Sequence, residues 1–200
     1  MIVHNEKLGG RLPLLDPQAL SVAQKEVYDR MNRTFVSWAE GIHFQSKTED
    51  GRLIGPFNPI LFSPRISARF LDLHDAEEKD TSLSERVRQV VILAVGAVWK
   101  SEYELYAHTA AAREAGISED AIRTLAIGGL PDDLSDQEKI AQRYARQLSA
   151  EHRVDAALYD AAEHAFGQQG LVDIIYLTGI YHIVCALLNA FEIPVPGSQV

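Results

Sequence analysis

The chain has 200 residues, of which 46% are hydrophobic and 24% charged, a balance that excludes a disordered chain and allows a sizeable core. A net charge of −9 with no run of Lys or Arg argues against a nucleic-acid partner. The single cysteine, Cys185, excludes an intramolecular disulfide. These features favour one globular domain over residues 1–200.

The first fifteen residues contain no apolar segment of the kind found in signal peptides, so we expect a cytoplasmic protein. Asp16 and Pro17 resemble an N-cap followed by proline at the first helical position, which predicts a helix to about Ala39. Glycine, proline and polar residues then alternate from Gly41 to Phe62, as in functional loops. Residues 16–80 are therefore expected to hold N-terminal helices and a lid-like loop.

Helix signals continue after Pro64, where a short helix is predicted to end near His74, before an acidic stretch. Ser84 is placed to cap a helix that is apolar nearly all round from Val90, typical of a central buried helix. Two further helices, Ser101–Ala115 and one from Ser118 to the Gly128-Gly129 pair, complete a group over residues 84–128.

The C-terminal part, residues 135–192, opens with a capping-box pattern of Ser135 and Glu138 and contains two more predicted helices. The last of them, Leu171–Phe191, is apolar but carries three polar side chains that a bilayer would disfavour. These residues are Asp173, His182 and Asn189. We expect a buried helix that is suited to a subunit contact, rather than a membrane span. No segment alternates apolar and polar residues as a strand does, so the predicted fold class is all-α.

One stretch of the chain carries candidate chemistry. On a helix, Ser101, Glu104 and His108 share one face by three-and-four spacing, and small apolar residues continue that face inward. A carboxylate one turn from an imidazole can tune it for acid–base work near neutral pH. The same Ser-x-x-Glu spacing is also a capping box, in which both side chains would bind backbone amides. Both interpretations stay open at this point.

The order of motifs resembles the carboxymuconolactone decarboxylase and alkylhydroperoxidase-D superfamily. The resemblance rests on Tyr103-Glu104, His108, Ala115-Gly116-Ile117-Ser118 and Ile122 after Ser84-Glu85-Arg86, and extends to Gly55-Pro56-Phe57-Asn58-Pro59 and to residues 166–196. It implies an alkylhydroperoxidase-D-like helical domain and a homo-oligomer.

The chain departs from the peroxidase branch of this superfamily. That branch has cysteines seven and four positions before the histidine and a glutamate about nineteen before it; here Ser101, Glu104 and Gln89 occupy these positions. Peroxide reduction by that route needs a thiolate and a resolving thiol, so it is excluded.

The decarboxylase branch fits the residues present. The resemblance implies decarboxylation of a small unsaturated lactone or organic acid without a cofactor, with His108 as general acid and Glu104 as its orienting partner. Ser101, Gln89 and His182 are candidate substrate contacts. Four arginines could hold a substrate carboxylate, although solvated helix faces explain them equally well. They are Arg65, Arg69, Arg86 and Arg88.

Two alternatives remain. One is a peroxidase-related enzyme with unusual thiol chemistry, for which Cys185 is the sole candidate, although a lone cysteine among apolar residues is usually inert. The other is a non-catalytic ligand-binding oligomer that keeps the scaffold. Glu104 and His108 could supply two metal ligands, but no third is recognisable, so we predict no metal. The expected partner is a small molecule, with no membrane.

Overall fold

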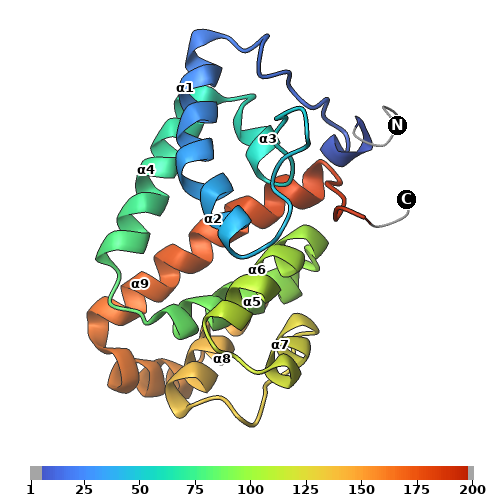
Figure 1. Cartoon of the computed structure of the whole chain (residues 1–200). Helices are drawn as coiled ribbons and strands as arrows, with labels where there is room; N and C mark the ends of the chain where they lie inside the picture. The colour runs from blue at the N-terminus through green and yellow to red at the C-terminus, as the bar shows by residue number, and fades with distance from the viewer. Residues whose placement is uncertain (1–5, 198–200) are drawn as a thin grey trace. The chain divides into compact units, whose positions relative to one another are not determined.

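The computed structural model describes residues 6–197, which form two compact units: residues 6–74 with 186–197, and residues 75–185. The all-α prediction is confirmed, because helices hold most of the described chain and its β-structure is one isolated bridge between Lys47 and Leu53. Figure 1 shows the helices coloured in chain order. The expectation of no signal peptide partly concerns residues 1–5, which lie outside the described residues.

The first unit begins with a 3₁₀ turn (Glu6–Gly9) and α1 (Val22–Met31), which continues through a π-helical turn (Asn32–Val36) into α2 (Ser37–Gly41). The predicted helix start at Asp16 is wrong. The carboxylate oxygen Oδ1 of Asp16 accepts a hydrogen bond from the backbone N–H of Gln18 at 2.8 Å, and this bond stabilises a turn. The helix starts later because Ser21 and Gln24 form a complete capping box there.

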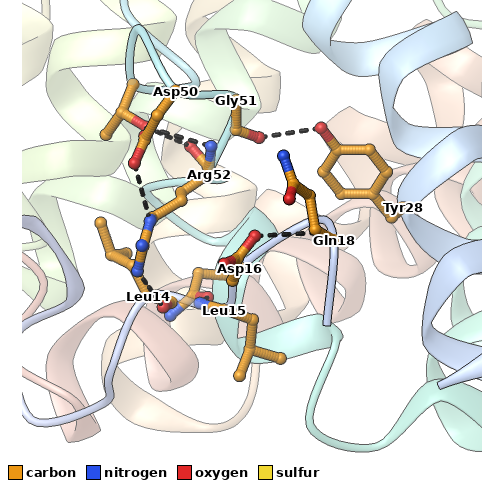
Figure 2. A network of polar contacts seen from close by, with 10 residues as sticks. Leu14, Leu15, Asp16, Gln18, Tyr28, Asp50, Gly51 and Arg52 are labelled. Carbon is orange, nitrogen blue, oxygen red and sulfur yellow. Dashed lines mark hydrogen bonds and ion pairs between the residues drawn. The ribbon is translucent and has the colours of Figure 1, made fainter. Parts of the chain in front are cut away.

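The predicted lid-like loop is a packed connector. Figure 2 shows two hydrogen bonds that hold it. Arg52 Nη1 donates to the carbonyl oxygen of Leu14 at 3.1 Å, and the hydroxyl of Tyr28 donates to the carbonyl oxygen of Gly51 at 2.9 Å. Residues 53–61, which include α3 (Phe57–Ile60), are buried. Apolar residues between the glycines and prolines hold this segment in the interior of the first unit.

The helix after Pro64 is longer than predicted. Helix α4 (Pro64–Asp80) continues through the acidic stretch where an end near His74 was expected. In the second unit, Arg88 Nη2 lies 2.7 Å from Glu77 Oε2, and the Glu77 side chain is 3% exposed. The partner for this carboxylate comes from another helix, which explains why local sequence signals missed the last turns of α4.

The second unit is built on α5 (Glu85–Trp99), which packs against α6 (Glu102–Glu114), α7 (Glu119–Ala126) and α8 (Asp136–Glu151). Figure 1 shows these four helices grouped together. Residues 87–96 of α5 are all buried, as its apolar pattern predicted. Ser84, Ser118 and Ser135 each cap the helix they were expected to begin.

Helix α9 (Ala156–Ala190) contains the two predicted C-terminal helices, separated at Gly167, whose φ of 65° lies outside the helical region. Within the described residues it is the one helix long and apolar enough to cross a membrane. Half of its most apolar window is buried, and core helices of soluble proteins pass the same test of length and composition. Its exposed apolar residues include Val172, Tyr176 and Ile183. The expected homo-oligomer stays a prediction.

Candidate functional site

The connection between α5 and α6 sets the geometry of the site. Lys100 adopts the left-handed conformation (φ 51°), and the Ser101 N–H bonds to the carbonyl oxygen of Gly96 at 3.0 Å. A Cβ added to Gly96 would lie 3.4 Å from Glu104 Cγ and 3.2 Å from the side chain of Leu105. The glycine therefore allows the first turns of α6 to lie close against α5.

The imidazole of His108 lies between a side chain from each helix. Its Nδ1 is 2.9 Å from Gln89 Oε1 on α5, and its Nε2 is 3.2 Å from Glu104 Oε1 on α6. Gln89, Glu104 and His108 are 2%, 2% and 6% exposed. The structure thus brings together three of the residues that the sequence singled out, inside the protein.

Glu85 determines the orientation of this group. Gln89 Nε2 donates to Glu85 Oε1 at 2.6 Å, and an ionised carboxylate can only accept, so the amide oxygen of Gln89 must face the ring. That oxygen can only accept, so His108 Nδ1 carries a proton. In a neutral ring the lone pair is then on Nε2, the atom that faces Glu104.

Glu104 is a buried acid that keeps its proton at neutral pH. Burial raises its pKa to about 8. Its Oε1 accepts no hydrogen bond of good geometry, and the 3.2 Å contact with His108 Nε2 is an ion-pair distance alone. With a proton on Glu104 and a neutral ring on His108, neither group places a net charge in the interior.

The capping-box interpretation of Ser101 and Glu104 is wrong. Ser101 is the N-cap of α6, but its side chain makes no capping hydrogen bond, with ψ at 97°. Ser135 and Glu138, at the same spacing, form a complete capping box, and ψ of Ser135 is 162°. The tight connection before α6 turns Ser101 away from the helix amides and leaves Glu104 free to face the imidazole.

Tyr181 is a neighbour of the site that the sequence pattern did not reveal. Its ring stands edge-on to His108, with centroids 5.0 Å apart and planes at 90°. Burial, followed by the nearby Glu104, raises the pKa of the Tyr181 hydroxyl well above its usual value. A tyrosine within an apolar helix gave no local signal of this role, since its position depends on packing between α6 and α9.

A buried ion pair lies beside this tyrosine. Arg88 Nη2 is 2.7 Å from Glu77 and its Nη1 is 2.8 Å from Glu85. Burial is the largest single influence and opposes the charge of Arg88. The hydrogen bond that Arg88 donates to Glu77, together with the surrounding negative charges, outweighs burial and holds the pKa of Arg88 above its ordinary value. One sequence signal could have revealed this polar face of α5: the otherwise apolar helix carries polar residues at three- and four-residue spacing. These residues are Glu85, Arg88 and Gln89.

Cys185 lies in the core and is suited to packing rather than catalysis. It is 0% exposed, and burial, then Glu104, raises the pKa of its thiol far above the usual value. The nearby hydroxyl of Ser101 offsets that shift slightly. A thiol held in this form is a poor nucleophile. Ser101 Oγ and Thr178 Oγ1 are buried hydroxyls without a hydrogen bond of ordinary length.

His182 lies apart from this group. Its Nε2 is 2.8 Å from Ser149 Oγ, and its ring centroid is 5.7 Å from that of Trp99. Burial, followed by the charge of His152, lowers the pKa of His182. Its contacts within the described chain are with these residues and do not include His108. The role of His182 as a substrate contact stays a prediction.

The remaining candidate arginines are engaged elsewhere or exposed. Arg86 Nε is 2.6 Å from Glu138, and Arg69 Nη1 is 3.0 Å from Asp72. Arg65 is exposed on α4. Among residues 6–197, no three His, Cys, Asp or Glu side chains are arranged to hold a metal ion.

Comparison with known families agrees with this geometry. Residues 64–147, the segment that contains Gln89, Glu104 and His108, match the model of the Carboxymuconolactone decarboxylase family. This match covers less than half of the chain, and it supports the resemblance to the carboxymuconolactone decarboxylase and AhpD-like superfamily. No curated protein matches the chain.

Several solved structures share the fold of this chain. A peroxidase-related protein from Ralstonia eutropha JMP134, described as an alkylhydroperoxidase AhpD core, aligns over 94% of this chain and 92% of its own, with a TM-score of 0.72 and 19% identity. A peroxidase-related protein from Silicibacter sp. TM1040 aligns over 96% and 95%, with a TM-score of 0.73 and 15% identity. The debrominase Bmp8, solved as a cysteine-to-alanine variant with 2,3,4-tribromopyrrole, covers 90% and 94%, with a TM-score of 0.67 and 11% identity.

Proposed function

We propose that this protein is a lyase that decarboxylates a small unsaturated lactone or organic acid by proton transfer from the Glu104–His108 pair, without a cofactor. The observation that carries the proposal is the buried carboxyl of Glu104, with its pKa near 8, at 3.2 Å from Nε2 of an imidazole whose other nitrogen is held by Gln89. A proton held at this pH is available for donation.

The proposed reaction moves one electron pair and one proton. The bond between the substrate carbon and its carboxylate breaks, carbon dioxide leaves, and the electron pair enters the conjugated carbonyl. Glu104 passes its proton to the lone pair of His108 Nε2, and this nitrogen delivers that proton to the enolate carbon. The pair is left as a carboxylate and a neutral ring, and solvent restores the proton.

The proposal assigns Glu104 a second role beyond orienting the ring. Since Nδ1 is engaged by Gln89, donation is directed through Nε2, and the proton reserve is on the acid beside it. The ring of Tyr181 packs edge-on against His108, so substrate entry requires this ring to move. A small ring compound bound to the related debrominase is consistent with a substrate of this size.

The alternatives have less support. A scaffold that keeps Glu104 and Ser101 only for helix capping would show capping hydrogen bonds, and Ser101 makes none. A thiol peroxidase would need a reactive thiolate, whereas Cys185 is fully buried with a raised pKa. We therefore retain acid–base chemistry as the function that the site supports best.

Decarboxylation assays test the proposal. The parent protein is incubated with 4-carboxymuconolactone and other small unsaturated acids, and carbon dioxide release is measured together with deuterium uptake at the product carbon in D₂O. We expect His108→Ala to lower kcat by about a hundredfold or more, the usual contribution of a positioned acid. Glu104→Gln should lower it by a similar factor and remove the decline in rate that the parent shows as the pH rises through about 8.

The matched control is His164→Ala, since His164 is an exposed histidine of the same unit. This variant should retain the parent rate. Decarboxylation at the parent rate by His108→Ala would exclude the assignment, and no turnover of any unsaturated acid by the folded parent would exclude the substrate class.

A further inference from the structure

A second candidate site lies in the same unit, away from the residues of the proposed reaction. A cleft of about 250 Å³ is bounded by the loop after α7, the outer face of α8 and the start of α9. Two leucines contribute apolar surface to it, Leu130, which is 43% exposed, and Leu158, which is 5% exposed. Arg143 and Arg146 on α8 line the same cleft.

Both arginines are exposed. The charge of Arg143 contributes to the lowered pKa of Asp155, which lines the same cleft, so Arg143 already lies in a mixed electrostatic environment. Eight other arginines of the described chain form ion pairs with carboxylates. Arg143 and Arg146 are three positions apart on one helix, so their guanidinium groups emerge on the same side. Planar guanidinium groups are suited to bidentate binding of a carboxylate.

The acidic residues of the cleft are already occupied. Asp155 Oδ1 accepts from the backbone N–H of Leu158 at 2.9 Å at the start of α9, and Asp155 N donates to Gln147 Oε1 at 3.1 Å. Glu151 Oε2 accepts from Gln147 Nε2 at 3.3 Å. Their negative charges nevertheless oppose a ligand with several charges, so the cleft favours an anion with a single charge.

We propose that this cleft binds an organic monocarboxylate, with Arg143 and Arg146 holding the carboxylate and Leu130 and Leu158 covering its apolar part. The two arginines supply charge-assisted hydrogen bonds, and the leucines supply a surface that an inorganic anion does not use. This site is independent of the Glu104–His108 pair, and its ligand need not be the substrate.

Calorimetric titration with hexanoate, acetate and inorganic phosphate tests the proposal. Hexanoate should bind at least about tenfold more tightly than acetate because its longer chain reaches the leucines. The double variant Arg143→Gln with Arg146→Gln should weaken hexanoate binding at least about tenfold, the scale expected for lost charged hydrogen bonds. The exposed positions of these arginines allow the variant to fold, which circular dichroism checks.

The matched control replaces Arg33 and Arg153 with glutamine, which removes the same charge from exposed positions outside the cleft. It should change hexanoate affinity by less than about twofold. Equal weakening by both double variants would show a general charge effect and overturn the proposal. Binding of phosphate more tightly than hexanoate, unchanged hexanoate binding in the cleft variant, or no binding by the parent would also overturn it.

Discussion

Replacing Glu104 with glutamine tests the proton held inside the protein through its effect on stability. Burial raises the pKa of Glu104 from 4.5 to about 8, so the folded state keeps a proton that the unfolded state releases. Stability from this proton is present at low pH and is lost as the pH rises towards 8. Above pH 6.5 Glu104 of the unfolded chain is ionised, and His108 is at most half protonated in the parent and in the variant alike. The change in the free energy of unfolding between pH 6.5 and pH 8, compared with the variant, therefore reports the proton of the folded Glu104–His108 pair, whichever of the two groups carries it.

The magnitude follows from about 1.4 kcal/mol per pH unit, which gives about 2 kcal/mol over this window. Urea unfolding of the parent and of Glu104→Gln at several pH values measures it. The free energy of unfolding of the parent should fall by about 2 kcal/mol relative to the variant between pH 6.5 and 8. The control is Glu102→Gln, an exposed glutamate of the same helix, which should follow the parent. Parallel curves for the parent and Glu104→Gln would refute the buried proton.

Two further substitutions test the packing described above, both by chemical unfolding at pH 7. Arg88→Met leaves the buried carboxylate of Glu77 without its partner and should lower the free energy of unfolding by about 3–5 kcal/mol. The control Arg69→Met, at an exposed ion pair, should lower it by less than about 1 kcal/mol. Similar losses for both variants would contradict the role of burial. Gly10→Ala should destabilise by about 2 kcal/mol or more, because Gly10 has φ of 60° and an added Cβ would lie 2.1 Å from a carbonyl oxygen, while Gly41→Ala, which meets nothing within 4 Å, should be neutral or stabilising.

Local signals predicted much of the fold. Ser84, Ser118 and Ser135 each have an extended backbone and a side chain that binds the helix amides, which are local properties. The helix starting at Val22 was misplaced because Asp16 can satisfy a turn as well as a helix start. The end of α4 was misplaced because Glu77 finds its partner on another helix. The first error lies between two local solutions, whereas the second was decided by a contact with another helix.

At the site too, local sequence signals decided some features and contacts between helices decided others. The spacing of Ser101, Glu104 and His108 placed an acid and an imidazole on one helix face, and the absence of cysteines at the first two positions excluded dithiol chemistry. Two Ser-x-x-Glu patterns in this chain have opposite outcomes: Ser135 forms a capping box with the glutamate three residues on, and Ser101 does not. The sequence by itself determined which groups share a face, because helix periodicity is local. Only the tertiary structure decided that Glu104 is buried against α5, since desolvation and the contact with Gln89 depend on another helix.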